Sequence, residues 1–133
     1  MSSHELLHPR SWKPALGYSN GVVASGRTLF LGGMNGWNDQ QEFESDDFIE
    51  QVAQALRNIV VVLAEGGAGP EHLVRLTWYV TDRDEYLARQ RELGGVYREI
   101  IGKHFPAMAL VQVVALVERR AKVEIEATAV VPQ

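Results

Sequence analysis

The change of hydrophobic period between residues 46 and 102 constrains the fold of this chain more than any other feature. Apolar residues from 48 to 63 recur at intervals of three and four, which places them along one side of an α-helix. Residues 74–81 instead alternate between apolar and polar side chains, the pattern of a β-strand. Helical spacing returns over residues 82–101. The sequence therefore predicts two helices separated by a strand.

Both predicted helices carry residues that begin and end helices. Asp46-Asp47 opens the first, because carboxylates are stabilised at the positive N-terminal end of a helix. Gly66-Gly67 closes it, since glycine adopts the left-handed conformation of a C-terminal cap at little cost. Asp82 and Glu85 give the second helix a start similar to a capping box, and Gly102 ends it.

Short β-prone segments flank the two helices. The pair nearest the N-terminus is joined through Ser25-Gly26-Arg27, so we expect it to form a hairpin. Residues 1–18 show little periodicity and are predicted to be an extended arm. The order β-β-α-β-α-β-β predicts one α+β domain over residues 1–133, with both helices on one face of the sheet. The predicted strands are Val22–Ala24, Thr28–Gly32, Val74–Thr81, Ala107–Val114 and Lys122–Val131.

Both faces of the predicted sheet carry apolar residues. On the strand after Pro106, Ala109, Val111 and Val113 share the face opposite to that of Met108. A sheet that helices cover on one side has to bury its second apolar face elsewhere, and another subunit suits that role. We therefore expect an oligomer.

Composition and motifs exclude several classes of function. A net charge of −4 argues against nucleic acid as the main ligand, and no apolar run reaches the ~18–20 residues of a membrane span. Residues 1–10 lack the pattern of a secretory signal and the chain has no cysteine, so we expect a cytoplasmic protein. The histidines are dispersed and no glycine-rich nucleotide motif occurs, so we expect neither a metal nor an organic cofactor.

Five segments, spread over almost the whole chain, carry a further pattern. They are Gly17-Tyr18-Ser19-Asn20, Phe30-Leu31-Gly32-Gly33-Met34, Asn58-Ile59, Trp78-Tyr79-Val80-Thr81-Asp82, and the closing pair Pro106-Ala107 with Val123-Glu124-Ile125-Glu126-Ala127. The ordered set resembles the RidA/YjgF family, also labelled endoribonuclease L-PSP. This resemblance implies a chorismate-mutase-like α+β fold and a barrel-like homotrimer with ligand clefts between subunits. It also implies hydrolysis of reactive enamines and imines to 2-oxo acids and ammonia without a cofactor.

The resemblance assigns two catalytic roles. Glu124 stands at the glutamate associated with the hydrolytic water, which a carboxylate can orient and deprotonate. Tyr18 stands at the tyrosine that lines the cleft, where it would cap a ligand or donate through its hydroxyl. From the residues alone, the polar face of a strand is the favoured interpretation of Glu124. With the resemblance, that interpretation and the catalytic role of Glu124 have equal weight, and a packed aromatic beside the arm is an equal alternative for Tyr18.

One position departs from the family pattern. Met108 stands where the resemblance implies an arginine that binds the substrate carboxylate. An arginine makes two charge-assisted hydrogen bonds to a carboxylate, and losing them at a desolvated site costs ~2–5 kcal/mol. Methionine offers a polarizable apolar surface instead, so a small 2-imino acid should bind poorly unless Arg27 or Arg75 replaces the missing cation. The predicted substrate contacts are Met108, Gly32, Gly33, Tyr97, Gln112 and Ala107.

Gly94-Gly95 lies inside the second predicted helix, where each glycine costs about 1 kcal/mol relative to alanine. We therefore expect another group to approach the helix backbone closely. Tight packing of this helix on the sheet is the explanation that we favour. Space for a ligand or for a neighbouring subunit is the alternative.

Two classes of function remain open. The first is a hydrolase, a cofactor-free deaminase of enamines or imines whose substrate is larger or less charged than small 2-imino acids. The second is a non-catalytic trimer that binds a small metabolite or acts as a chaperone. A ribonuclease activity, suggested by the family's older label, is disfavoured by the acidic charge.

Overall fold

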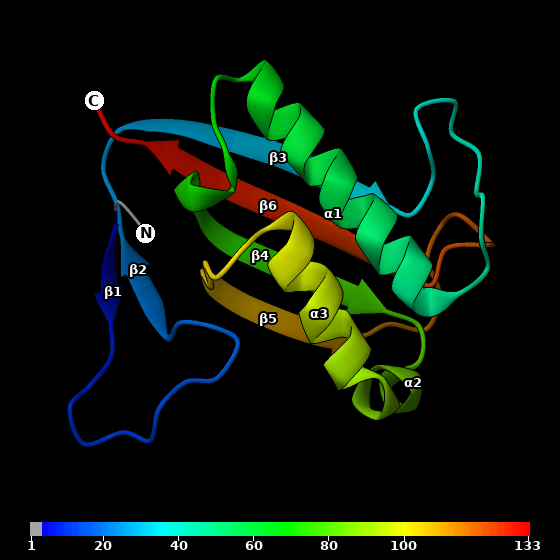
Figure 1. The fold of residues 1–133 in the computed structure, drawn as a ribbon, viewed down its shortest axis with the longest axis horizontal. Coiled ribbons are helices and arrows are strands. Elements are labelled where there is room, and N and C mark those ends of the chain that lie inside the picture. Colours follow the sequence, from blue (N-terminus) through cyan, green and yellow to red (C-terminus); the bar gives the residue numbers. More distant parts are fainter. Residues whose placement is uncertain (1–3) are drawn as a thin grey trace.

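Four strands form a mixed sheet in the computed structural model, which describes residues 4–133 (Figure 1). Strand β6 (Val123–Val131) lies between β3 (Arg27–Asn35) and β4 (Leu73–Val80) and is antiparallel to both. The edge strand β5 (Ala107–Gln112) runs parallel to β4. Because parallel neighbours need a crossover connection, the chain has to leave the sheet between β4 and β5.

Two helices cover one face of this sheet. Helix α1 (Phe48–Glu65) lies over β3 and β6, and α3 (Gln90–Ile100) lies over β4 and β5 (Figure 1). The short helix α2 (Arg83–Ala88) precedes α3 and completes the crossover, while the 3₁₀ turn η1 (Pro70–His72) leads from α1 into β4. The predicted α+β architecture, with both helices on one face, is confirmed.

The predicted helix starts are confirmed by their capping bonds. Asp47 Oδ2 accepts a hydrogen bond from Glu50 N at 3.0 Å, and Asp82 Oδ1 accepts one from Glu85 N at 3.1 Å. At the other end of α1, Gly67 has a φ of +75°, the left-handed conformation for which glycine is suited. Local sequence therefore sets where these helices begin and where α1 ends.

The segment predicted as one helix over residues 82–101 is two helices that meet at Arg89. The backbone of Arg89 has φ −118° and ψ 25°, outside the α-helical region. Its guanidinium donates to Asp47 Oδ1 at 2.7 Å and to Glu92 Oε2 at 2.8 Å. The break thus coincides with a contact to the N-terminal cap of α1, which local apolar spacing does not encode.

The predicted hairpin between residues 22 and 32 is wrong. Strand β2 (Gly21–Val23) pairs instead with β1 (Glu5–Leu7), which lies within the predicted arm, in a separate two-stranded sheet. Gly26, with a φ of +145°, lies so close to the carbonyl of Val131 that a Cβ would overlap it. The chain therefore passes the end of β6 here and does not fold back on itself. Residues 1–3 of the arm lie outside the described residues.

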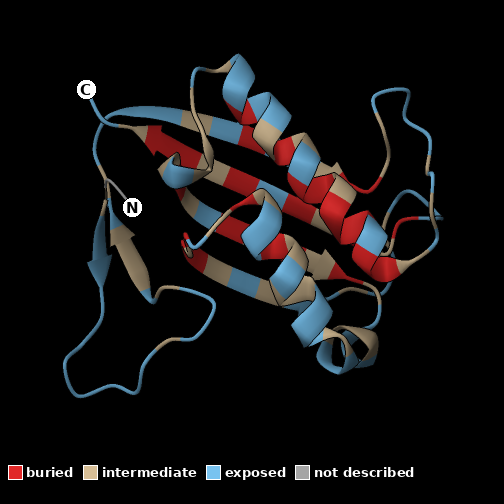
Figure 2. Cartoon of the chain, in the orientation of Figure 1, coloured by how far each residue is buried: buried red, intermediate tan, exposed pale blue. Residues whose placement is uncertain are grey.

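A continuous apolar core fills the space between the helices and the sheet (Figure 2). The inward faces of β4 and β6 supply one side, with Trp78 only 3% exposed and Ile125 fully buried. Burying one Leu, Ile or Phe side chain contributes ~1.5–3 kcal/mol, so this layer dominates the stability of the fold. The stripe of α1 that its spacing predicts supplies the other side: Phe48, Ile49, Val52, Leu56, Ile59 and Leu63.

The opposite face of the sheet, here called the open face, is mixed in character. Tyr79 of β4 and Glu126 of β6 lie there, and the Tyr79 hydroxyl donates to Glu126 Oε1 at 2.6 Å. Large apolar side chains stand toward its margins, since Phe30 of β3 is 82% exposed and Val111 of β5 is 46% exposed. One chain leaves these side chains uncovered, so the expected oligomer stays a prediction.

The cap of α1 provides a test of the fold. We expect Asp47→Ala to lower the free energy of unfolding by about 1–2 kcal/mol, because it removes the N-cap acceptor together with the partner of Arg89. Urea unfolding followed by circular dichroism measures this change. Asp46→Ala is the matched control: its exposed pair with Arg120 is expected to contribute ~0–1 kcal/mol. Equal losses in the two variants would contradict the assignment of Asp47 as the structural cap.

Candidate functional site

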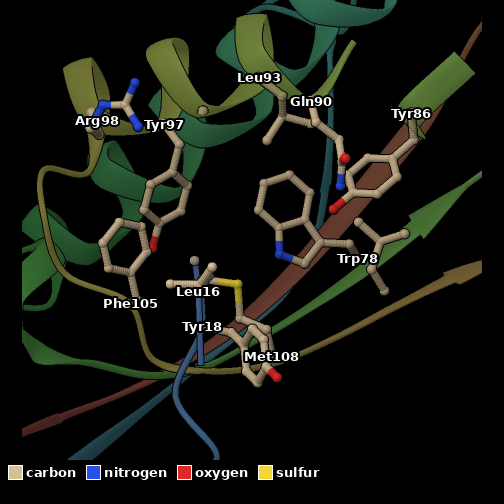
Figure 3. A pocket seen from close by; sticks show the side chains of 13 residues that line it. Leu16, Tyr18, Trp78, Tyr86, Gln90, Leu93, Tyr97, Arg98, Phe105 and Met108 are labelled. Atoms are coloured by element: carbon tan, nitrogen blue, oxygen red, sulfur yellow. The ribbon is translucent and has the colours of Figure 1, made fainter. Parts of the chain in front are cut away.

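A pocket of about 440 Å³ opens between α3, the edge strand β5 and residues 16–18 of the N-terminal segment (Figure 3). This volume falls within the ~300–1,000 Å³ typical of small-molecule sites. Its walls are mainly apolar and aromatic, and they include Leu16, Tyr18, Trp78, Tyr97, Phe105 and Met108.

The N-terminal segment reaches this pocket because it is bonded to the chain just before β5. Ser19 N donates to Pro106 O at 3.0 Å, and the Ser19 hydroxyl donates to the carbonyl of Phe105. Gly17, with a φ of +80°, lets the chain turn immediately before this contact. Tyr18 is thereby held at the pocket that Met108 also lines.

Three aromatic rings form a layer along one wall. The Tyr97 ring stacks on Phe105 with centroids 5.3 Å apart, and Trp78 lies 6.4 Å from Tyr97 in a tilted arrangement. The Tyr97 hydroxyl donates to His104 O at 2.6 Å. Burial raises the pKa of Tyr97 well above its ordinary value, so this hydroxyl stays protonated and bonded to the backbone. Tyr97 therefore contributes a wall of the pocket and no titrating group.

Trp78 brings an unpaired donor to the same pocket. Its indole Nε1 is buried and finds no hydrogen-bond acceptor anywhere in residues 4–133. Figure 3 shows this nitrogen turned toward the side of the pocket where Leu16 and Met108 lie. A buried donor without an acceptor costs ~1–3 kcal/mol, so an acceptor on a bound molecule would recover part of that cost.

Glu124 lies on the open face and not at this pocket. It is aligned with Tyr79 of β4 and with Asn35 of β3, and its carboxylate lies against the backbone of Gly33. A Cβ at Gly33 would overlap the carboxylate, which explains why a residue without a side chain stands there. The pairing of β3 with β6 shifts register between Leu31 and Met34, so Gly33 sits in a local bulge.

The predicted site residues thus separate into two groups. The pocket group consists of Tyr18, Tyr97 and Met108. The open-face group consists of Glu124 with Gly32 and Gly33. Side chains alternate across a strand, and the register puts Met108 level with residues of β4 and β6 that face the helices. Within one chain, the sheet therefore stands between the Glu124 carboxylate and the pocket.

Two predicted contacts lie elsewhere. Gln112 does not line the pocket, because its Oε1 accepts a hydrogen bond from Arg83 N at 2.7 Å and so joins β5 to the start of α2. Ala107 is buried, aligned with Arg75 of β4, and forms a bridge with Ser19 that helps to hold the N-terminal segment.

The cation of the pocket is one that the sequence reasoning missed. Arg75 is aligned with Ala107 and Thr128 on the open face, and Arg27 lies near Gly67 at an end of the sheet. Neither lines the pocket, whereas Arg98 of α3 does. Arg98 makes no ion pair within the described part of the chain. The sequence does place Arg98 one helical turn after Gly94, and this spacing could have indicated that the two residues are neighbours on α3.

Tight packing does not explain the glycine pair in α3, so the interpretation that we favoured is wrong. A Cβ at Gly94 would meet only Arg98 Nη1, at 3.4 Å, and a Cβ at Gly95 would meet nothing within 4 Å. Gly94 lines the pocket. The missing side chain at Gly94 therefore leaves space for the pocket and for the guanidinium of Arg98.

Two further properties of the described residues bear on function. Across residues 4–133, no cluster of three or more His, Cys, Asp or Glu side chains is placed to bind a metal ion. No helix in this part of the chain has the length and apolar character needed to cross a membrane.

The chain is similar to known proteins along nearly its full length. The family model described as endoribonuclease L-PSP matches residues 9–131. A RutC family protein of Aquifex aeolicus is 32% identical over 127 residues, which cover 95% of this chain and 98% of that protein. A 2-iminobutanoate/2-iminopropanoate deaminase of Capra hircus is 32% identical over 114 residues, covering 85% of this chain and 79% of the deaminase. The crystal structure of YyfB from Yersinia pestis, a Rid family protein of unknown function, matches with a TM-score of 0.86 at 31% identity, covering 96% of this chain and 98% of YyfB.

His104, which supports the aromatic wall, predicts a pH dependence of stability. Its Nε2 donates to Leu73 O at 2.8 Å, and burial lowers the pKa of His104 below its ordinary value of 6.5. Below pH 6.5 the unfolded chain takes up a proton that the folded chain resists, so the free energy of unfolding falls as the pH drops from 7 to 5. Urea unfolding at both pH values should show a smaller fall in His104→Gln, whose amide also donates. Equal falls in the two proteins would contradict this role of His104.

Proposed function

The chain belongs to the RidA/YjgF family, and from this membership we propose that it hydrolyses a reactive enamine or imine to a carbonyl compound and ammonia. The observation that carries the proposal is the state of Glu124. Of the two glutamates that β6 presents on the open face, Glu126 accepts a hydrogen bond from Tyr79. Glu124 makes no hydrogen bond or ion pair within residues 4–133, so its carboxylate is available to a water molecule.

The two groups of site residues require a second subunit if they are to act together. We propose a homotrimer in which the open face of one subunit meets the pocket edge of the next. The exposed apolar side chains Phe30, Val111 and Leu16, the last of which is 84% exposed, support this arrangement because they lie where such a contact would bury them. The Glu124 carboxylate of one subunit would then reach a ligand held by Tyr18 and Met108 of its neighbour.

The proposed reaction needs one carboxylate and one water. The water gives a proton to Glu124 as its oxygen bonds to the iminium carbon, and the electron pair of the C=N double bond moves onto nitrogen. The protonated Glu124 then gives that proton to the nitrogen, which makes it a better leaving group. Cleavage of the C–N bond releases ammonia, and the carbonyl forms as the hydroxyl loses its proton to the ammonia. The sum is iminium plus water giving carbonyl plus ammonium, and Glu124 is returned as the carboxylate.

The substrate that suits this pocket is larger than a small 2-imino acid. Goat and human relatives are named 2-iminobutanoate/2-iminopropanoate deaminases. Here Met108 and Leu110 of β5 face a pocket with an aromatic wall. The one- or two-carbon side chain of those substrates would leave most of that apolar surface exposed to water, whereas a larger group would bury it and gain roughly 25 cal/mol per Å².

Met108 also supports a second candidate, a trimer that binds a small metabolite without converting it. A pocket that lacks the family's arginine at this position could retain apolar binding while losing the alignment needed for hydrolysis. Turnover separates the two candidates, because only the hydrolase depends on Glu124 for a rate.

An oxidase-coupled assay tests the proposed function. An L-amino-acid oxidase generates 2-imino acids in the presence of semicarbazide, and the protein competes with semicarbazide for them. We expect hydrolysis by the wild type, and a rate about 10²–10⁴-fold lower in Glu124→Gln, the range for loss of a general base.

The control for this assay is Glu126→Gln, which alters the neighbouring carboxylate that Tyr79 already occupies. It is expected to keep most of the wild-type rate. An equal loss in both variants, or no hydrolysis of any amino-acid-derived imine by the wild type, would count against the hydrolase and favour the metabolite-binding trimer.

A further inference from the structure

Trp78 and Arg98 bring to the pocket polar groups that lack a partner within residues 4–133 and that differ in depth. The Trp78 indole nitrogen is buried and lacks an acceptor within residues 4–133. Arg98 belongs to the exposed side of α3, yet it lines the same pocket. In Figure 3, Tyr97 lies between the two. A ligand that satisfied both groups would therefore run from the rim of the pocket, past an aromatic wall, to its interior.

We propose that this pocket selects an aromatic carboxylate, with the carboxylate on Arg98 and a hydrogen-bond acceptor at the other end of the ring on Trp78 Nε1–H. The reactive imine or enamine would then be one derived from an aromatic amino acid. The identity of the substrate class rests on the proposed function, whereas the binding preference itself does not depend on turnover.

The carboxylate end is argued from the guanidinium and its surroundings. A guanidinium offers parallel donors that match a carboxylate. Gly94 places the guanidinium beside the pocket, since a Cβ there would be in van der Waals contact with Arg98 Nη1 at 3.4 Å. The cation lost at Met108 on β5 is thus replaced by one on α3, at a different point of the pocket rim. A ligand whose carboxylate binds Arg98 on α3 would direct its apolar part toward the sheet.

The aromatic body and the distant acceptor are argued from the wall and from the buried donor. Tyr97, Phe105 and Trp78 all line the pocket, and the rings of Tyr97 and Phe105 stack on each other at an interplanar angle of 12°. An aromatic ligand would extend this group of rings, in which offset and edge-to-face contacts are favourable. Hydroxyl or carbonyl oxygen on the far side of a ring would accept from Trp78 Nε1–H. A ligand without such an acceptor would leave this donor unsatisfied and bind less tightly.

Four unreactive probes separate these contributions in calorimetric titrations. They are 3-(4-hydroxyphenyl)propanoate, 3-phenylpropanoate, propanoate and 3-(4-hydroxyphenyl)propanamide. We expect the hydroxylated acid to bind most tightly and propanoate to bind weakest. Replacing the carboxylate with the amide should raise the Kd about tenfold or more, and removing the ring hydroxyl should raise it about three- to tenfold.

Two variants assign these preferences to residues. Arg98→Gln should raise the Kd of the hydroxylated acid about tenfold or more and leave that of the amide unchanged. Trp78→Phe should remove the advantage of the ring hydroxyl. Arg91→Gln is the matched control, an exposed arginine on α3 that does not line the pocket, and it should change neither value.

The indole proton gives a test that needs no change at Trp78. In a ¹H–¹⁵N spectrum of the wild type, the Trp78 Nε1–H signal is identified by eliminating those lost in Trp12→Phe and Trp37→Phe. It should move downfield with 3-(4-hydroxyphenyl)propanoate and not with 3-phenylpropanoate. Any of three results would overturn the inference. They are equal affinities for propanoate and the aromatic acids, an unchanged Kd in Arg98→Gln, and an indole shift that is the same with and without the ring hydroxyl.

The outcomes distinguish this inference from the proposed hydrolysis. Selective binding of the aromatic acids by a protein without turnover would support the inference and oppose the hydrolase. Turnover that depends on Glu124, with no preference among the acids, would support the hydrolase and overturn the inference.

Discussion

The alternation of side chains across the sheet is the constraint on which the account of this protein depends. Successive residues of a strand point to opposite faces, and the pairing of β4 with β5 and β6 therefore fixes which residues can meet. Met108 falls level with Leu76 and Ala127 on the helix side, while Glu124 falls level with Tyr79 on the open face. A register slip of one residue would exchange these faces and bury carboxylates in the core. The alternation that buries the apolar core therefore also places Met108 and Glu124 on opposite faces of the sheet.

The sequence predicted the structural features that depend on residues close together in the chain. The caps at Asp47 and Asp82 and the two-residue alternation depend on a few neighbouring residues, and the structure confirms them. The break at Arg89 and the course of the chain at Gly26 depend on partners far along the sequence, Asp47 and Val131. Spacing carries no information about such partners, which is why these features were missed.

The same limit applied to the site. Motif positions placed Glu124, Tyr18 and Met108, but only the pairing of β4 with β5 and with β6 shows that they belong to two groups. Arg98 was not among the predicted site residues because its position at the pocket depends on how α3 lies relative to β5. Trp78 is one of the apolar residues in the alternation of residues 74–81, but that pattern does not show that its indole nitrogen lacks an acceptor within residues 4–133. Departure from a family pattern at one position therefore has to be judged against every residue that the fold brings to that pocket.

The most direct test of a site shared between subunits is complementation in a mixed oligomer. Glu124→Gln removes the carboxylate, and Gly94→Trp fills the pocket that Gly94 lines, so each variant alone should be inactive. When the two are co-expressed in equal amounts and mixed trimers are purified through different tags, about a third of the sites combine an intact pocket with an intact neighbouring Glu124. The account predicts that the mixture recovers imine hydrolysis at about that fraction of the wild-type rate. A mixture as inactive as its two components would contradict it.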